Sequence, residues 1–444
     1  MLIIKNGMVI DPVKDNVSQK DIYIEDGKIV KLVSADGNKA ADNENSEGMV
    51  GFGALGNEPT EVDEIIDATG LYVAPGLVDV HVHFREPGFT HKEDIDTGSA
   101  SAIKGGYTSV VLMANTKPAV DNLETLEYVK NRAKEQKLHV YTCANVTMGL
   151  KGNELTNMSE LYANGAVGFT DDGIPILDGE LLEKAFAEAV KLNVPISLHE
   201  ENPEFIENNG VNRGLASEHY GIGGSDRQAE ISMIKRDLEI ALKHNGIIDI
   251  QHISTKEGVE LVRNAKKISD RVHAEATPHH FTLTEEAVIE HGTNAKMNPP
   301  LRTADDREAV RKGLQDGTID MIATDHAPHS LEEKSKPITE APSGIVGLET
   351  ALSLAIRELI QSGIMTYPQL LHRMSTAPAK LYGLQAGEIE VDKPADLCIF
   401  SDKESWKVEK FASKASNSPF IGETLPGVVK YTICDGKVVY KETN

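Results

Sequence analysis

The chain has 444 residues, of which 40% are hydrophobic, and this is enough for a large domain and a smaller one. Its net charge of −24 argues against nucleic acid and anionic membranes as partners, because both select basic surfaces. Three widely spaced cysteines do not form a disulfide framework, and no apolar run approaches the ~20 residues of a membrane span. The start, MLIIKNG, carries a charge and a turn and is not typical of a signal peptide, so we expect a cytoplasmic protein.

Short strands joined by tight turns are expected at both ends of the chain. Asn or Asp followed by Gly supplies the positive φ angles that two-residue hairpins require. Three such pairs lie between strand-like runs: Asn6-Gly7, Asp26-Gly27 and Asp435-Gly436. We expect a small β-sandwich module assembled from both termini, with residues 1–74 as its first part and residues 385–444 as its second.

Residues 34–64 interrupt the first part of this module. The segment has eight acidic residues and a single basic one, Lys39, and it is rich in Gly and Asn. Such a composition cannot bury enough apolar surface to fold alone, so we expect an exposed acidic insertion in a surface hairpin. A solvated loop without function is the simplest interpretation of this insertion.

Apolar runs alternate with helical stretches between residues 75 and 384. Eight runs are typical of strands: 77–84, 108–115, 139–146, 166–172, 195–201, 247–254, 271–280 and 320–329. Helical periodicity lies between them, for example at 179–193 and 227–245. Strands separated by helices in this number predict an α/β fold, a (β/α)₈ TIM-type barrel with its site at the C-terminal ends of the strands.

The first of these runs, LVDVHVHF, places two histidines one residue apart. Side chains alternate along a strand, so His81 and His83 point to one face while the neighbouring valines point to the other. Two imidazoles on one face can bind one metal ion. Two solvent-facing histidines on an edge strand are the alternative interpretation, and the motif alone does not decide between them.

Most of the other runs also finish with residues that are capable of chemistry. These residues are Asn115, Asp171, Asp172, His199, His252, His279, His280, Asp325, His326 and His329. A buried barrel strand has no structural need for such an end, although any single one of these residues could cap a loop. Their coincidence at the rim where barrels place active sites indicates function.

Six side chains of this rim suit a borderline divalent metal such as zinc. They are His81, His83, Asp172, His199, His252 and Asp325. This number is too large for one open tetrahedral site and suits two ions that share a carboxylate. Such a pair lowers the pKa of a bound water molecule and polarises a carbonyl oxygen, which is the chemistry of amide hydrolysis.

The motifs around these residues resemble a known family. They are HVHFREPG (81–88), MANTKP (113–118), GFTDDG (168–173), QHISTKE (251–257), TPHHF (277–281), KMNPPLR (296–302), IATDHAPH (322–329) and GIVGLET (344–350). With the stretch that leads into the first strand, they resemble the cyclic amidohydrolases and, within that superfamily, the bacterial class I dihydroorotases. The resemblance covers nearly the whole chain, and the acidic insertion is the departure from it.

The resemblance implies a role for each metal ligand. It implies two zinc ions per subunit, with His81, His83 and Asp325 on one ion, His199 and His252 on the other, and Asp172 between them. Asp171 is the less suitable bridge, since adjacent side chains diverge. Asp325 would also be the catalytic acid and base that passes a proton to the leaving nitrogen.

The resemblance also implies a substrate site. Arg85 would bind the carboxylate of the substrate with its planar fork of donors. The other implied contacts are Asn115, Asn298, His329 and the backbone at Ser343 and Gly344. A salt bridge between Arg85 and its neighbour Glu86 is the alternative interpretation of this arginine.

The implied activity is the reversible cyclisation of N-carbamoyl-L-aspartate to L-dihydroorotate and water, a step of pyrimidine biosynthesis. Hydantoinase, dihydropyrimidinase and allantoinase are the nearest alternatives, but these relatives generally bridge their metals with a carboxylated lysine, and the run 166–172 has none. A catalytically dead scaffold that binds aspartate transcarbamoylase is a further alternative, against which the complete ligand set argues. We expect a small-molecule substrate and no nucleic acid or membrane partner; a homodimer and an association with aspartate transcarbamoylase are compatible with the resemblance.

Overall fold

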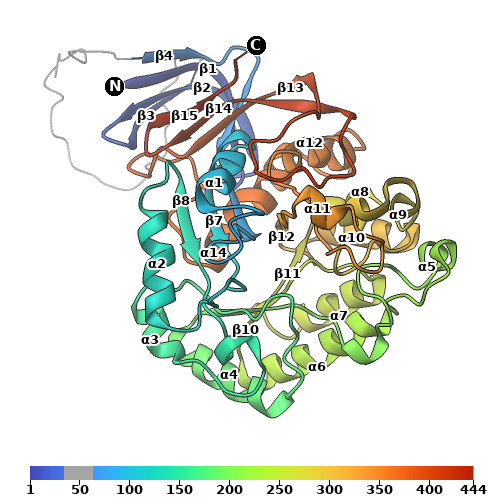
Figure 1. The fold of residues 1–444 in the computed structure, drawn as a ribbon. Helices are drawn as coiled ribbons and strands as arrows, with labels where there is room; N and C mark the ends of the chain where they lie inside the picture. The colour runs from blue at the N-terminus through green and yellow to red at the C-terminus, as the bar shows by residue number, and fades with distance from the viewer. Residues whose placement is uncertain (35–63, 444) are drawn as a thin grey trace, which may run out of the picture.

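The structure is a computed structural model that describes residues 1–34 and 64–443. A barrel of strands and helices carries a β-module on one side, and both ends of the chain lie in this module (Figure 1). The predicted acidic insertion, apart from its two end residues, lies outside the described residues. Within the described part of the chain, no helix combines the length and the apolar character that crossing a membrane requires.

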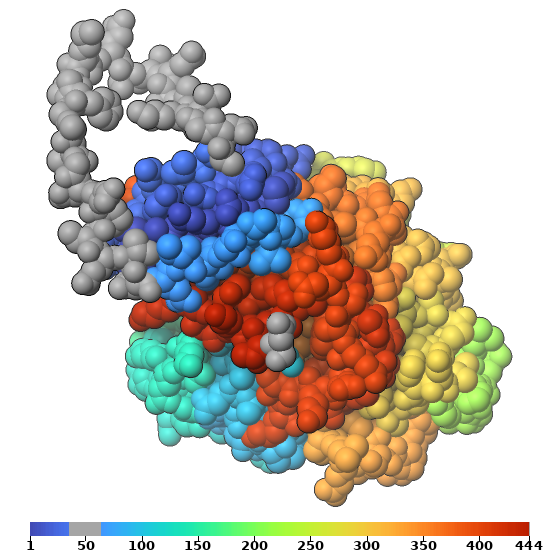
Figure 2. All heavy atoms as spheres, turned by 90° about the horizontal axis from the view of Figure 1, so that it is seen from above, coloured from blue at the N-terminus to red at the C-terminus, as the bar shows by residue number. Residues whose placement is uncertain are grey.

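The β-module is one eight-stranded sheet made from both ends of the chain. Its strands are β1 (Leu2–Asp11), β2 (Asn16–Glu25), β3 (Lys28–Ser34), β4 (Glu64–Asp67), β5 (Tyr72–Pro75), β13 (Leu397–Lys407), β14 (Thr424–Cys434) and β15 (Lys437–Lys441). Their order is β15-β14-β13-β5-β1-β2-β3, with β4 paired to β1. The antiparallel pair of β5 and β13 joins the two parts, and Figure 2 shows the N-terminal part of the chain (blue) beside its C-terminal part (red). A module that combines both termini is therefore confirmed.

Two of the three predicted hairpin turns are confirmed and one is wrong. Asp26-Gly27 joins β2 to β3, and Asp435-Gly436 joins β14 to β15, with positive φ at all four residues. Asn6-Gly7 instead lies inside β1, where the pairing with β2 shifts register. The positive φ of Asn6, 63°, serves a β-bulge, because a bulge can use the same backbone conformation as a tight turn.

The barrel has the parallel strands that the sequence predicts. They are β6 (Leu77–Val82), β7 (Tyr107–Leu112), β8 (His139–Thr142), β9 (Pro195–Leu198), β10 (Ile247–Ile250), β11 (Val272–Ala276) and β12 (Met321–Ile322). Between β8 and β9 the run 166–172 makes only single bridges, from Phe169 to Ala144 and to Ile196. A bridge between Val82 and His326 closes the ring. The TIM-type barrel is therefore confirmed, with its fourth strand reduced to these bridges.

Helices cover the outside of the barrel (Figure 1). The two predicted helices are α4 (Gly179–Leu192) and α6 (Gln228–His244), and each ends at an asparagine with φ of 54°, a residue that tolerates this left-handed position. The other α-helices are α1 (Ile95–Lys104), α2 (Leu123–Ala133), α3 (Met158–Ala163), α5 (Leu215–Tyr220), α7 (Lys256–Lys266), α8 (Pro278–Thr282), α9 (Glu286–His291), α10 (Ala304–Asp316), α11 (Leu331–Lys334), α12 (Ala351–Ala355), α13 (Tyr367–Leu371) and α14 (Ala377–Leu381).

Candidate active site at the barrel rim

Six of the ten polar residues predicted at the strand ends line one cavity at the rim of the barrel: Asn115, Asp172, His199, His252, Asp325 and His329. Asp171, His279, His280 and His326 do not line it. Every residue of β6, β7 and β9 is buried, so polar side chains at the ends of these strands are enclosed by protein. β9 ends at Leu198, directly before His199, and β10 ends at Ile250, two residues before His252. Because parallel strands of a barrel end on the same side, these side chains meet there.

Three residues of this rim have a left-handed backbone. Arg85, His252 and Asp325 have φ angles of 60°, 32° and 46°. Residues other than glycine rarely adopt this conformation, which costs about 1–3 kcal/mol and is concentrated at functional sites. β6 ends at Val82, so the strand alternation that orients His81 does not extend to Arg85. A left-handed turn of the backbone, and not a pleated strand, aims this arginine at the rim.

His81 and His83 face two carboxylates. The Nε2 atom of His81 lies 3.4 Å from Asp172 Oδ1 and 3.5 Å from Asp325 Oδ1. The Nε2 atom of His83 lies 2.9 Å from Asp325 Oδ1 and 3.4 Å from Asp172 Oδ2. Each imidazole therefore points its Nε2 atom between the same two acidic groups.

His199 and His252 approach Asp172 as well. His199 Nδ1 and His252 Nε2 are each 3.7 Å from Asp172 Oδ1 and 3.0 Å from each other. Among the described residues, Asp172 is thus the carboxylate that lies near all four histidines. Its central place is the one that a bridging ligand requires.

The neighbouring Asp171 serves a different purpose. Its carboxylate accepts hydrogen bonds from the backbone N–H groups of Val146, at 2.9 Å, and Thr147, at 3.2 Å. Burial raises its pKa to about 6, although these hydrogen bonds act in the opposite direction. Asp171 therefore holds the loop after β8, and the two adjacent aspartates diverge.

Three polar groups hold the outer nitrogens of the imidazoles. The contacts are Glu275 Oε2 to His81 Nδ1 (2.9 Å), Asn115 Oδ1 to His83 Nδ1 (3.0 Å) and Glu201 Oε2 to His199 Nε2 (3.1 Å). Partners of this kind fix the tautomer and the orientation of a ligating histidine. They leave the opposite ring nitrogen of each histidine facing Asp172.

Sequence reasoning missed two of these partners, Glu201 and Glu275. A charged residue inside the apolar strand β11 was the available signal for Glu275, since such a side chain needs a buried partner. Asn115 was expected at the substrate. In the structure its Nδ2 group donates to Asp172 Oδ2 at 3.1 Å, so Asn115 orients both His83 and Asp172 as well as lining the site.

The electrostatics of the cluster favour a bound cation. Burial disfavours the charged form of Asp172, but the surrounding histidines hold its pKa well below its ordinary value. Burial acts on Asp325 in the same way, and His81 and His83 lower its pKa. Both carboxylates are therefore ionised at neutral pH.

The residues present fit a metal centre. His81 Nε2 is buried and makes no hydrogen bond within the described part of the chain, although two carboxylate oxygens lie near it. The possible ligand atoms of His81, His83 and Asp172 lie within 4.8 Å of one another. The same holds for those of Asp172, His199 and His252. A divalent ion is the group that would give the buried Nε2 atom its missing partner.

A cavity of about 200 Å³ opens beside this cluster. It is lined by His83, Arg85, Asn115, Asp172, Gly173, His199, His252, Met297, Asn298, Asp325, Ala327, His329 and Ser343. Gly344 does not line the cavity, and its N–H donates to the carbonyl of Lys296 at 2.9 Å. The carbonyl of Ser343 accepts from His329 Nε2 at 2.8 Å. The backbone at 343–344 is thus already hydrogen-bonded within the protein.

Arg85 makes no ion pair with any of the described residues. Its Nε–H donates to the carbonyl of Pro328 at 3.3 Å. The neighbouring Glu86, which was the alternative partner, instead pairs with Arg132 Nε at 3.0 Å. The rest of the guanidinium is therefore available at the wall of the cavity.

Two lysines hold the segment that includes Ser343, a residue of the cavity wall. Lys334 Nζ donates to the carbonyls of Pro342, at 2.9 Å, and Gly344, at 3.1 Å. Lys296 Nζ donates to the carbonyls of residues 338 and 341, both at 2.7 Å. These four contacts give the two buried Nζ groups hydrogen-bond partners and fix the segment beside Ser343.

The sequence matches the Amidohydrolase family over residues 72–439. It is 49% identical to a dihydroorotase of Clostridioides difficile over 99% of this chain and 100% of that protein. It is 48% identical to a dihydroorotase of Streptococcus pneumoniae, again over 99% of this chain and the whole of the relative. A solved structure of L-hydantoinase (dihydropyrimidinase) from Arthrobacter aurescens superposes with a TM-score of 0.85 at 26% identity, over 100% of this chain and 96% of that one.

The chain therefore belongs to the amidohydrolase family and, within it, to the dihydroorotases. The barrel with a sheet from both termini is the fold of this family's solved members, and the hydrolase class follows from the same matches.

Proposed function

We propose that this protein is a metal-dependent dihydroorotase that interconverts N-carbamoyl-L-aspartate and L-dihydroorotate. The observation that carries the proposal is the guanidinium of Arg85, which lines the cavity beside the histidine and aspartate cluster without an ion-pair partner among the described residues. Dihydroorotate presents a carboxylate next to its cyclic amide. A planar fork of donors binds a carboxylate in two hydrogen bonds and so orients the ring.

Zinc is the metal we propose, with two ions per subunit. His81, His83 and Asp325 would hold one ion and His199 and His252 the other, with Asp172 shared between them. Imidazole and carboxylate ligands suit zinc, and the outer contacts of Glu275, Asn115 and Glu201 support this donor set. When bound, such a pair would activate water as a nucleophile and polarise the amide carbonyl.

The chain's own side chains would bind the substrate and move the proton. Asp325 would accept a proton during attack on the amide and deliver it to the departing ring nitrogen, because a carboxylate has a second oxygen for this work. Arg85 would bind the substrate carboxylate. Asn298 lines the cavity near His199, its Nδ2 group 3.3 Å from His199 Nε2, and would contact the ring. His329 and Ser343 also line the cavity and would contact the substrate, and a contact with the backbone of Gly344 stays a prediction.

Hydantoinase-type activity is disfavoured by the same arginine. Hydantoins and dihydropyrimidines need not carry a carboxylate, so their binding would leave the Arg85 guanidinium desolvated and unpaired, which costs binding energy. A dead scaffold is disfavoured because the buried donor set is complete. The cytoplasmic location, a homodimer and an association with aspartate transcarbamoylase stay predictions.

A substrate panel tests the proposal. The purified protein, supplied with zinc, is given L-dihydroorotate, dihydrouracil, hydantoin and allantoin, and ring opening is followed by ultraviolet absorbance and by detection of the carbamoyl product. We expect dihydroorotate to be the preferred substrate by kcat/KM. Preference for hydantoin or allantoin would replace the proposal with the alternative activity, and inactivity towards all four would favour the scaffold.

A further inference from the structure

A second group of metal-ligand side chains lies far from the barrel rim. His139, Asp396 and Cys434 place an imidazole nitrogen, a carboxylate oxygen and a sulfur within 4.8 Å of one another. His139 begins β8 of the barrel, while Asp396 precedes β13 and Cys434 ends β14 of the β-module. Every other cluster of this kind among the described residues belongs to the rim site.

The contacts in this group leave room for an ion. His139 Nε2 lies 3.0 Å from Asp396 Oδ2 and 3.7 Å from Asp435 Oδ1. The other oxygen of Asp396 accepts from the backbone N–H of Asp435 at 2.8 Å, so Oδ2 is directed at the imidazole. The thiol of Cys434 makes a long contact of 3.9 Å to the carbonyl of Thr108, which is a weak hydrogen bond.

Two members of this group are buried, while the side chains of His139 and Asp435 are 27% and 62% exposed. Asp396 and Cys434 are each 4% exposed, whereas a surface pair would be hydrated on most sides. Asp396 raises the pKa of His139, so the imidazole and the carboxylate already attract a shared positive charge. A divalent ion in place of that shared proton would gain the thiolate as an additional ligand.

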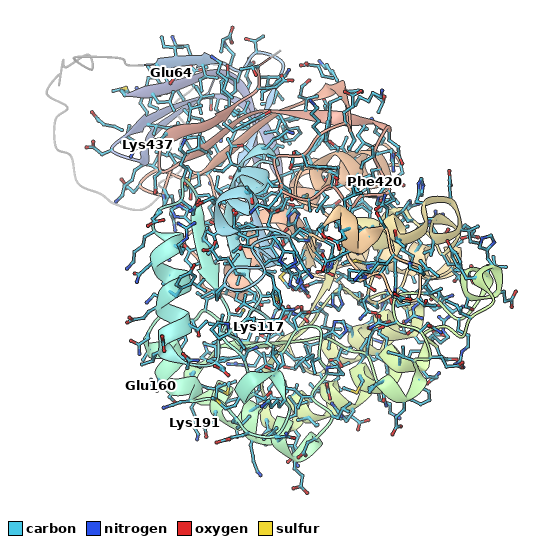
Figure 3. All side chains as sticks on the ribbon, in the orientation of Figure 1. Glu64, Lys117, Glu160, Lys191, Phe420 and Lys437 are labelled. Carbon is cyan, nitrogen blue, oxygen red and sulfur yellow. The ribbon has the colours of Figure 1, made fainter. Side chains whose placement is uncertain are left out.

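A cavity gives access to this group. It measures about 660 Å³, lies between α2 and β8 on one side and β14 and β15 on the other, and is lined by His139, Cys434 and Asp435. Lys437, labelled in Figure 3, lies on its β-module side. A thiolate and two carboxylates exceed the charge of one divalent ion, and lysines at the cavity wall offset the surplus.

We propose that His139, Asp396 and Cys434, with Asp435 as the fourth ligand, bind one borderline divalent cation of the zinc type. A tetrahedral set of nitrogen, sulfur and oxygen ligands without an open position is typical of structural zinc sites. The ion would join the barrel to the β-module, since its ligands come from both. This site is independent of catalysis at the rim and does not rest on the proposed function.

Cobalt substitution tests the site directly. The rim donors are histidine and aspartate only, so a thiolate-to-cobalt charge-transfer band in the near ultraviolet can come only from a site with a cysteine ligand. Metal-depleted full-length protein is titrated with Co²⁺, and the band and the bound cobalt per chain are measured. We expect a saturable band and one more bound ion per chain than in Cys434→Ser.

Matched variants separate the site from alternatives. Cys398→Ser removes another buried thiol outside the group and should keep the band, while Cys434→Ser should lose it. If Cys434→Ser does not fold, His139→Gln keeps the thiol and should weaken cobalt binding at this band by about tenfold or more. Absence of a band in the wild type, or a band that survives in Cys434→Ser or is unaffected by His139→Gln, would overturn the proposal and leave an ion pair between the two parts of the fold.

Discussion

His81 Nδ1 lies 2.9 Å from Glu275 Oε2, and neither side chain is exposed to solvent. The contact holds the imidazole so that Nε2 faces Asp172 and Asp325, and with a metal ion bound it would keep the ring proton on Nδ1. Glu275 therefore acts on the candidate metal centre without reaching it. A ligand of this kind loses both its tautomer and its orientation when the outer partner is changed.

We expect Glu275→Gln to weaken metal binding and dihydroorotate turnover by about 10–100-fold. The amide is of similar size but is a poorer acceptor than the carboxylate, so the imidazole is held less firmly. Metal affinity is measured by competition with a chromogenic chelator. Glu127→Gln, at an exposed position on α2, is the matched control and should bind metal like the wild type. Equal affinity in both variants would show that Glu275 does not position His81.

Asp325→Asn should retain metal better than it retains turnover. The amide oxygen can still contact an ion, but an amide cannot carry a proton, and general acid–base groups contribute about 10²–10⁴-fold to rate. The measurements are kcat for dihydroorotate and metal content of the same preparation. If kcat falls by less than about tenfold while the metal content is unchanged, Asp325 is not the proton-transfer group.

Arg85→Met should reduce kcat/KM for dihydroorotate by roughly 10- to 150-fold, because a charge-assisted hydrogen bond contributes about 1.5–3 kcal/mol. Metal content should not change, since Arg85 is not one of the proposed metal ligands. Slow hydrolysis of dihydrouracil, which lacks the carboxylate, should fall much less. The ratio of the two activities is compared in wild type and variant, and an unchanged ratio would mean that Arg85 does not recognise the carboxylate.

Strand periodicity predicted the part of the site that regular backbone produces. His81 lies within β6 and His83 just after it, and both point their Nε2 atoms to the same carboxylates, as alternation requires. The eight apolar runs separated by helical segments likewise predicted the barrel. These features depend on local repeats of hydrophobic and polar residues, which are visible in the amino-acid sequence itself.

Features that depend on irregular backbone or on distant contacts could not be predicted in this way. Arg85 reaches the cavity through a left-handed φ, and Asn6-Gly7 forms a bulge in place of a turn because β1 continues past it. Glu275 meets His81 across 194 positions of sequence. No local sequence pattern indicates that Glu275 contacts His81, because the packing of the barrel strands determines which side chains meet.

The buried Lys334 predicts a pH dependence of stability. Burial lowers its pKa to about 7 in the folded protein, from its ordinary value of 10.5. Between these two pH values the unfolded chain binds the proton and the folded protein does not, so this residue's contribution to stability rises with pH. The contribution is fully present above the unfolded pKa and is lost as pH falls to the folded pKa of about 7.

Replacing Lys334 with Met should remove this dependence. The free energy of unfolding of the wild type, relative to that of Lys334→Met, should rise between pH 7 and 9 by at most about 1.4 kcal/mol per pH unit. The melting temperatures of the two proteins, measured across this range, follow the change. Lys336→Met, at an exposed neighbouring position, is the control and should follow the wild type. A constant difference between wild type and Lys334→Met across this range would show that the lysine keeps its ordinary pKa when folded.

Removal and restoration of the metal, with dihydroorotate as substrate, tests whether this protein is a metal-dependent dihydroorotase. The protein is treated with a chelator, its residual zinc is quantified, and hydrolysis of L-dihydroorotate is measured before and after zinc is returned. We predict that ring opening falls in proportion to the zinc removed and recovers when zinc is restored. Full activity in a preparation shown to contain no metal, or no activity towards dihydroorotate in the fully reconstituted protein, would contradict the account.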